Sequence, residues 1–490
     1  MNPAALLPWL FVLPLTASAL LVPLFHDRPR AAAVVASVVA MATVLVALAV
    51  LLALPDDGPL KHAIGGWAAP MGIELRFDRL SAITIVFGFV VALVTVFAVR
   101  PALRFGPRPA LFHALVLANL GGLNGFAITG DLFNLYVFLE LASVSAYALV
   151  AVGREPGAAL AAVKYLLAGA VSSLLVLLGI GLVFALTGSL NMADVAVRLP
   201  EVNAPGAVGL ALAAFTVGFL VKAAVFPLHF WLPDAHAAAP GPVSALLSAL
   251  VVKLGVIGLV RTLALFDGVP GALLPVIDGV LVVLGAVAVL AGAIAAIVQH
   301  ELKRMLAWST VCNLGYIVLG LGLATTASMA GSLAHVAYHG LTKAGVFLAA
   351  AALIEHTGLH DIDDLRGLGH RMPWSATALS AGLIAVAGVP PTAGFVGKWQ
   401  IALGALEAGR PLLVLVILGG ALLALVYAIR VINALFFRAP THARVVTARE
   451  APITMLVPLV ILTGLALAGG LSGALVIEFL APLVEGMHGR

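Results

Sequence analysis

The chain alternates long apolar runs with short polar connections over almost its whole length. Windows of about 20 apolar residues, the length that crosses the hydrocarbon core of a bilayer, recur about fourteen times. The predicted spans are residues 4–25, 31–54, 80–99, 111–129, 132–152, 158–186, 207–226, 243–264, 272–298, 302–324, 328–354, 373–407, 411–437 and 452–480. No polar stretch is long enough for a soluble domain. We therefore expect an all-α polytopic membrane protein in which residues 1–490 form a single membrane domain.

Composition supports this class and excludes several chemistries. The chain is 62% hydrophobic and only 10% charged, whereas soluble domains are roughly one quarter charged. Cys312 is the single cysteine, so an internal disulfide and the roughly four thiolates of an iron–sulfur cluster are excluded. No glycine-rich nucleotide motif stands out, which argues against ATP-driven transport. We expect no cofactor, no metal site and no catalytic residues, and whether the chain belongs to an enzyme complex stays open.

Arginine and lysine are distributed unevenly between the two sets of connections. Loops after odd-numbered spans carry thirteen of them: Arg28, Arg30, Arg100, Arg104, Arg108, Arg154, Lys303, Arg304, Arg366, Arg371, Arg438, Arg444 and Arg449. Loops after even-numbered spans and the C-terminal tail carry seven: Lys61, Arg76, Arg79, Arg198, Arg261, Arg410 and Arg490. The positive-inside rule then predicts both termini on the outer side of the membrane. The same bias explains the net charge of +4, and no nucleic-acid partner is needed.

Ionisable residues inside apolar segments are the most informative feature. They are Glu140, Lys164, Lys222, Lys253, Lys343 and Lys398. Each such group costs about 2.5–3.5 kcal/mol at the bilayer centre, so six cost on the order of 15–20 kcal/mol. That cost indicates function. Two alternatives stay open: Lys164 lies near a helix end and reaches the interface, or Glu140 only satisfies a nearby hydroxyl or lysine.

Buried lysines and carboxylates suit proton transfer. Desolvation favours the neutral amine, while a carboxylate at about 4 Å favours the ammonium by about 4 kcal/mol. Histidines add groups that titrate near neutral pH. His335 and His339 share one helical face, which Lys343 extends by another turn. The spacing predicts a proton wire; the alternative is a polar row that only holds helices together.

Two spans contain breaks beside these lysines. Lys222 is followed by several prolines in a segment that also holds His229, Asp234 and His236, which we treat with Lys164 and Lys343 as possible relay or entry residues. Lys398 follows Pro390-Pro391. Interrupted helices expose backbone groups that protein or water must satisfy. The breaks therefore predict hydrated pockets.

Three segments carry a resemblance to a known family. Residues 131–140, 222–236 and 388–398 resemble the antiporter-like subunits shared by respiratory complex I, membrane-bound hydrogenases and Mrp cation/proton antiporters, most of all the Mrp D subunit. The resemblance implies a fourteen-helix fold with two inverted five-helix repeats. The expected divisions are N-terminal helices over 1–110, repeats over 111–264 and 272–437, and a C-terminal helix and tail over 452–490.

The resemblance also implies roles for single residues. Glu140 is expected to pair with Lys222, Lys253 to be the central lysine, Lys398 the terminal one, and His335 and His339 to connect the two halves.

The expected function is proton translocation in a multisubunit Na⁺ (or other cation)/proton antiporter of the cell (inner) membrane. The expected partners are small and large membrane subunits, protons, a monovalent cation and the lipid bilayer. One alternative is a proton-pumping subunit of a redox-driven complex, either complex I or a membrane-bound hydrogenase. Another is a scaffold whose polar network serves only helix packing. The sequence does not identify the cation.

Overall fold

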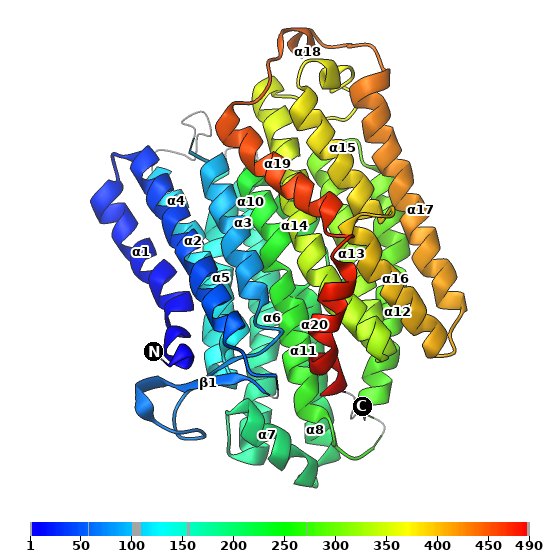
Figure 1. The fold of residues 1–490 in the computed structure, drawn as a ribbon. Helices are drawn as coiled ribbons and strands as arrows, with labels where there is room; N and C mark the ends of the chain where they lie inside the picture. The colour runs from blue at the N-terminus through cyan, green and yellow to red at the C-terminus, as the bar shows by residue number, and fades with distance from the viewer. Residues whose placement is uncertain (1, 57, 100–108, 154–156, 272, 488–490) are drawn as a thin grey trace.

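The computed structural model describes residues 2–56, 58–99, 109–153, 157–271 and 273–487. The predicted loop cations Arg100, Arg104, Arg108, Arg154 and Arg490 lie outside the described residues. The remainder is a bundle of long helices with one short β-hairpin (Figure 1).

The first half of the chain is coloured blue through cyan to green in Figure 1. Its elements are α1 (Trp9–Phe25), α2 (Pro29–Leu52), β1 (Leu60–Ala63), β2 (Glu74–Phe77), α3 (Ile83–Phe97), α4 (Pro109–Ile128), α5 (Leu132–Ala151), α6 (Ala158–Thr187), α7 (Met192–Arg198) and α8 (Pro205–Lys222). Asp131 begins α5 by accepting a hydrogen bond from the Asn134 amide, as N-cap aspartates do. β1 and β2 pair antiparallel, with Lys61 opposite Arg76.

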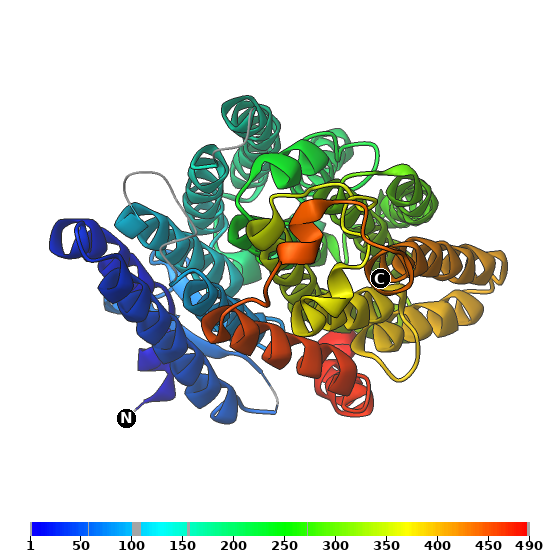
Figure 2. The same cartoon turned by 90° about the horizontal axis from the view of Figure 1, so that it is seen from above.

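The second half surrounds the long helix α14 (Figure 2). Its elements are α9 (Leu232–Ala238), α10 (Gly241–Leu246), a π-helical turn (Leu247–Val251), α11 (Lys253–Leu263), α12 (Leu273–Val298), α13 (Leu302–Leu323), α14 (Thr326–Thr357), α15 (Pro373–Ala387), α16 (Ala393–Glu407), α17 (Leu412–Ile432), α18 (Ala443–Thr447), α19 (Ile453–Ala468) and α20 (Gly473–Glu485). α13, α15, α16 and α19 pack directly against α14. Side chains on α14 therefore lie at the centre of the second half.

The prediction of a polytopic all-α membrane protein is confirmed. In the described part of the chain, eleven helices are long and apolar enough to cross a membrane, and the number is twelve if the bent pair α19–α20 crosses as one span. The predicted ranges 80–99 and 373–407 correspond to shorter helices, α3 and the pair α15–α16. The count of about fourteen spans and the two inverted repeats stay predictions.

Breaks in the helices agree in part with the prediction. α8 ends at Lys222, and α15 and α16 are separated at residues 388–392, as the prolines indicated. Other irregularities were not predicted. A π-helical turn directly precedes Lys253, and α19 and α20 meet at a 76° bend.

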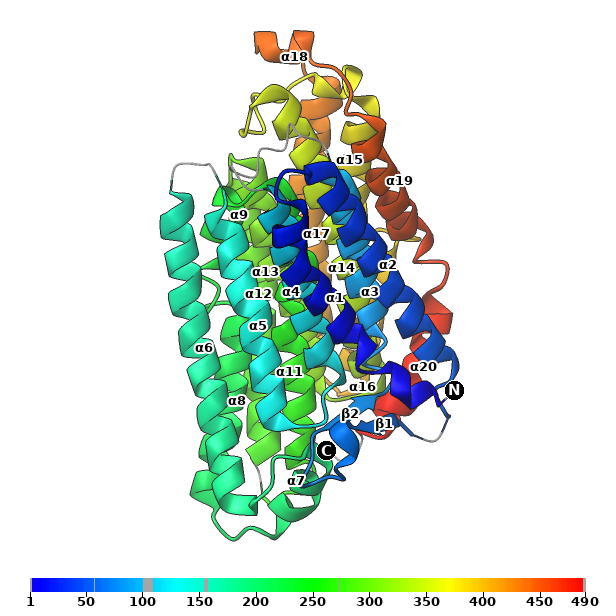
Figure 3. The same cartoon turned by 90° about the vertical axis from the view of Figure 1, so that its left-hand side faces the viewer.

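Among the cations assigned to loops, two are buried inside long helices. Arg261 belongs to α11 and Lys303 to α13, and both are buried. The assignment was wrong because a charge near the end of a predicted span was counted with the adjoining connection, while a helix continues wherever that charge finds a partner. Lys303 is removed from the loops after odd-numbered spans and Arg261 from the loops after even-numbered spans. The loops after odd-numbered spans therefore still carry more arginine and lysine. The first and last described residues lie at the same end of the bundle, beside the hairpin (Figure 3). Which side of the membrane they face stays a prediction.

Candidate functional site

Three predicted relay residues meet at the centre of the bundle. Lys253 is fully buried, and its Nζ donates to the Ser248 carbonyl at 2.5 Å and lies 2.8 Å from Nδ1 of His339. The rings of His339 and His335 lie one helical turn apart on α14, with centroids separated by 5.7 Å. The π-helical turn before Lys253 is the kind of local widening that is frequent at functional sites. This arrangement brings one amine and two imidazoles into a single row.

A polar face of α13 runs along this row and was missed by the sequence analysis. Ser309, Asn313 and Tyr316 follow one another at helical spacing. Ser309 accepts a hydrogen bond from Lys343, Asn313 Oδ1 lies 3.1 Å from His335 Nε2, and the Tyr316 ring centroid lies 4.6 Å from Lys398 Nζ. Each residue therefore contacts a different ionisable group. The signal in the sequence was a repeat of neutral polar residues, which costs too little in a membrane to stand out.

Lys343 and His236 extend the row toward α9. Lys343 is fully buried, and its Nζ donates to the Leu306 carbonyl at 2.8 Å as well as to Ser309. The His236 ring stacks on Phe347 with centroids 4.6 Å apart, and Lys343 Nζ lies 5.6 Å from the same phenyl ring. Neither nitrogen of the buried His236 has a hydrogen-bond partner. His236 is thus a proton-accepting group beside Lys343.

Lys398 closes the row at its other end. Its Nζ donates to the carbonyls of Val386 and Ala387, at 2.8 and 2.9 Å. These carbonyls end α15, and a helix C-terminus carries partial negative charge that favours a cation. The backbone groups freed by the break are therefore satisfied by the lysine itself. Gly388 has φ of +87°, and a Cβ there would lie 2.9 Å from Lys398 Cδ, so the close approach requires glycine.

Lys222 ends α8 inside an aromatic enclosure. Its buried Nζ donates to the Ser143 hydroxyl and lies 3.4 Å from the Tyr147 hydroxyl. The Tyr165 ring, whose centroid is 5.9 Å from Nζ, stacks on Trp231. Trp231 Nε1 in turn donates to the Val221 carbonyl at 3.1 Å, which satisfies part of the broken helix end.

Glu140 lies one helical turn before Ser143 on α5. It interacts with Lys222 electrostatically through space, but no direct ion pair joins the two among the described residues. One carboxylate oxygen of Glu140 is buried without a hydrogen-bond partner. Lys222 is bound to hydroxyl groups in this structure, and its direct pairing with Glu140 stays a prediction.

Lys164 and Asp234 lie at the mouth of a pocket at the α18 end of the bundle. Lys164 Nζ donates to Asp234 at 2.7 Å, and Arg304 pairs with the other oxygen of Asp234 at 3.0 Å. The pocket, of about 420 Å³, is also lined by Glu301 and Asp361. Lys164 is half exposed, so its reach toward solvent agrees with the interfacial alternative. His229 lies apart, between the rings of Phe226 and Trp308.

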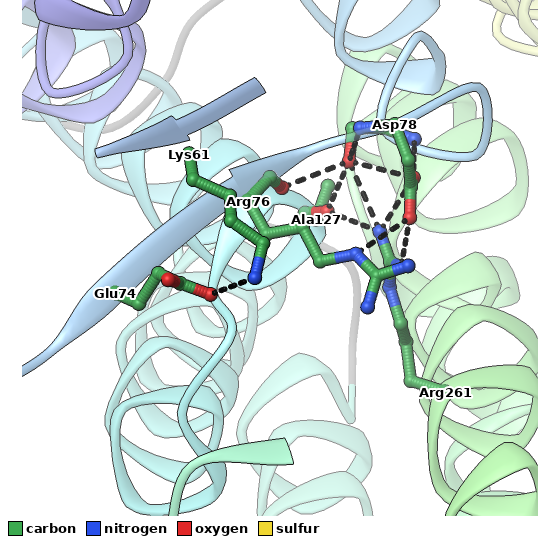
Figure 4. Close-up of polar contacts among 7 residues, drawn as sticks. Lys61, Glu74, Arg76, Asp78, Ala127 and Arg261 are labelled. Carbon is green, nitrogen blue, oxygen red and sulfur yellow. Dashed lines mark hydrogen bonds and ion pairs between the residues drawn. The ribbon is translucent and has the colours of Figure 1, made fainter. Parts of the chain in front are cut away.

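A second charged cluster was missed because its members were counted as loop residues. At the opposite end of the bundle, Arg261 of α11 donates to both oxygens of the buried Asp78 and to the Ala127 carbonyl, while Arg76 lies 3.4 Å from Asp78 (Figure 4). Burial favours the neutral acid, but Arg261 and Arg76 together keep the pKa of the Asp78 carboxyl below its usual value. This cluster lines a second pocket of about 590 Å³.

Lys303, the other reassigned cation, has a structural partner. Its Nζ donates to the carbonyls of Ala237 and Ala239, at 2.6 and 2.9 Å, where α9 ends. In the described residues, no group of three or more His, Cys, Asp and Glu side chains is placed to hold a metal ion.

The fold and the buried row define a polytopic membrane protein with ionisable groups along its centre. The chain belongs to the family described as NADH:quinone oxidoreductase/Mrp antiporter, transmembrane, which matches residues 129–424. It is 38% identical to the N subunit of the NADH-quinone oxidoreductase of Desulforudis audaxviator over 91% of each chain. It is 30% identical to the D subunit of the Na⁺/H⁺ antiporter of Alkalihalophilus pseudofirmus, over 95% of this chain and 94% of that one.

Solved structures show the same fold over almost the whole chain. A chain of the Mrp complex from a Dietzia species superposes with a TM-score of 0.90 at 25% identity, covering 100% of this chain and 98% of that one. A chain of the membrane-bound sulfane sulfur reductase, an archaeal respiratory membrane complex, also gives 0.90, at 30% identity and with 99% and 98% covered. The family predicted from the three sequence segments is confirmed.

Proposed function

We propose that this chain is the proton-translocating subunit of a multisubunit cation/proton antiporter. The observation that carries the proposal is the 2.8 Å contact between Lys253 and His339, within a row of buried ionisable groups. A proton held by an amine at hydrogen-bond distance from an imidazole can transfer directly between them. The row then continues from His339 to His335 and toward Lys398.

Entry takes place at Glu140 and Lys222. The end of α8 packs closely on α11, since a Cβ at Gly255 would collide with the Ala223 amide nitrogen. Lys222 and Lys253 therefore belong to two elements in direct contact. Loss of the proton from Lys222 would leave a neutral amine beside Ser143, and the charge of Glu140 would favour its reloading.

The driving force is the membrane potential. Moving one charge across 100 mV is worth about 2.3 kcal/mol, which is comparable to one Glu–Lys interaction at an effective dielectric of about 20. Proton entry is thus coupled to the expulsion of Na⁺ or another monovalent cation through the assembled complex. Other membrane subunits complete that complex in the cell membrane, with both termini of this chain on the outer side. The relatives named as antiporter D subunits and the Mrp complex support this assignment.

A redox-driven proton pump is the second candidate. The 38% identity to an NADH-quinone oxidoreductase subunit favours it, as does the fold shared with the sulfane sulfur reductase complex. The row of ionisable groups would be the same, and electron transfer in partner subunits would supply the energy.

Sealed inverted vesicles containing the whole complex separate the two candidates. A pH gradient is imposed without an electron donor, and Na⁺, Li⁺ and K⁺ are added in turn. Antiport predicts that the gradient collapses with at least one cation and that Lys222→Ala abolishes the response while the complex still assembles. A complex that responds to no cation and acidifies its lumen only with an electron donor is a redox pump. A Lys222→Ala variant that fails only in assembly would indicate a scaffold.

A further inference from the structure

The side-chain amide of Asn313 has a determined orientation. Its Nδ2 donates to the carbonyl of Ser309 at 2.8 Å, which requires the nitrogen on that side, because an amide oxygen there would face another oxygen. Oδ1 consequently points at His335 Nε2, 3.1 Å away. An amide oxygen only accepts hydrogen bonds, so Nε2 of His335 carries the hydrogen. Both side chains are fully buried.

The other nitrogen of His335 faces a different helix. Nδ1 is buried without a hydrogen-bond partner, and a Cβ at Gly397 of α16 would lie 2.8 Å from it. Gly397 directly precedes Lys398. The lone pair of Nδ1 therefore lies at the contact between α14 and the broken helix pair that holds the terminal lysine.

We propose that Asn313 is a positioning residue that restricts His335 to exchanging protons through Nδ1 alone. This inference rests on the proposed function. An incoming proton binds the Nδ1 lone pair and gives an imidazolium, whose Nε2–H stays bonded to Asn313. The same Nδ1–H bond then breaks as the proton moves on toward α16. The amide oxygen is too weak a base to take a proton, so α13 offers no side branch to the relay.

His339 is arranged differently, which makes the assignment specific to His335. Its Nδ1 contacts Lys253, and its Nε2 has no hydrogen-bond partner. His339 can therefore accept a proton on one nitrogen and release one from the other. The titratable groups that face His335 are Lys398 on α16, Lys253 on α11, His339 on α14 and Tyr316 on α13.

The test combines a spectroscopic and a functional measurement on the assembled complex. ¹⁵N NMR of histidine-labelled complex, with His335→Gln used to assign the signal, is expected to show His335 protonated on Nε2. Exchange is then measured in inverted vesicles for Asn313→Leu and Asn313→Asp. Asn124→Leu is the control, because Asn124 is an equally buried amide that donates to the Leu10 carbonyl at 2.8 Å, far from the row in sequence.

Asn313→Leu is expected to lower exchange by on the order of tenfold or more, since it leaves a buried donor unpaired, and to mix the two His335 tautomers. Asn313→Asp places a carboxylate on Nε2 that stabilises the imidazolium, so the midpoint of exchange against pH is expected to rise by about one unit. Asn124→Leu is expected to keep the wild-type pH profile. If the Asn313→Leu complex does not assemble, the inference is tested by the other two measurements. These are the dependence of exchange on pH in Asn313→Asp and the tautomer of His335 in the wild-type complex.

A wild-type His335 protonated on Nδ1 would overturn the inference, as would an Asn313→Asp pH profile that matches wild type. Neither result touches the proposed function. Absence of cation-driven exchange in the wild-type complex would instead contradict the proposed function and leave the tautomer measurement standing.

Discussion

The ammonium nitrogen of Lys253 and Nδ1 of His339 lie 2.8 Å apart in the centre of the protein. Lys253 has one other hydrogen-bond partner there, the carbonyl of Ser248, which cannot take up a proton. Of the two contacts, only the imidazole can accept the lysine proton. The Lys253–His339 contact is therefore a direct proton-transfer step at the centre of the protein, and the other buried groups of the row lie on either side of it.

Lys253→Arg tests whether Lys253 acts by releasing a proton or only through its positive charge. Arginine keeps the positive charge and the hydrogen bonds, but its pKa above about 12 prevents it from releasing a proton. We expect exchange to fall by about 10²-fold or more, the usual worth of a positioned acid or base, while the complex assembles. Lys61→Arg on the exposed hairpin is the control, and wild-type exchange in Lys253→Arg would show that the lysine acts only through its charge.

Ser143→Ala tests the hydroxyl that holds Lys222. Removing one hydrogen bond to an ammonium costs about 1.5–3 kcal/mol, and the freed amine is expected to move toward Glu140. We expect slower proton release and an exchange rate reduced about tenfold. Ser173→Ala is matched to it, because Ser173 is buried but bonds only to backbone carbonyls of its own helix. Equal rates in the two variants would exclude Ser143 from the entry site.

Gly388→Ala tests the close contact at Lys398. A Cβ at this position combines a strained backbone with a collision on the lysine side chain. Gly409 has a positive φ of +66° with no atom within 4 Å of the added carbon, so Gly409→Ala introduces only the backbone strain, about 1–2 kcal/mol. We expect both variants to lose thermal stability and only Gly388→Ala to lose exchange. Loss of exchange in both would assign the effect to general destabilisation.

Asp78→Asn tests the buried cluster at the hairpin end. Leaving Arg261 without its carboxylate is expected to cost about 3–5 kcal/mol of stability, measured as a lower unfolding temperature of the solubilised complex. Asp56→Asn, whose carboxylate is fully exposed, is the control and is expected to unfold like wild type. Wild-type stability in Asp78→Asn would show that the ion pair contributes little.

The pH dependence of the stabilisation by the buried Asp78 ion pair follows from the direction in which folding shifts the pKa of Asp78. The pKa of Asp78 is below its usual value in the folded protein. Its stabilisation is therefore complete above the ordinary carboxyl pKa of about 3.9 and is lost as the pH falls through the lower folded value. The stability difference between wild type and Asp78→Asn is expected to be constant from about pH 5 to 8. A difference that changes across that window would contradict the assignment.

The class of fold was predictable from the sequence because long apolar runs have few other uses. Lys253, Lys343 and Lys398 were identifiable for the related reason that each charge is costly in hydrocarbon. The same reasoning missed Ser309 and Asn313, since neutral polar side chains cost little and resemble ordinary packing residues. Asn313 is distinguished only by its neighbour, 22 positions away on another helix.

Arg261 illustrates a different limit. It lies near the end of the predicted span 243–264 and was counted as a loop residue, and its partner Asp78 lies 183 positions earlier in the chain. Only the tertiary fold brings the two together, so composition and spacing do not reveal that the charge is paired inside the protein. The contact of Lys222 with Ser143 is also determined by the tertiary fold. The sequence alone does not show which of several polar groups the amine contacts.

The rate of pH-gradient collapse in sealed inverted vesicles, compared between His339→Ala and His113→Ala complexes, tests the central claim most directly. His113 is also buried, in α4, but lies outside the row. The relay predicts that His339→Ala loses cation-driven collapse while His113→Ala retains it at equal complex content. Retained exchange in His339→Ala would contradict proton transfer through the Lys253–His339 contact.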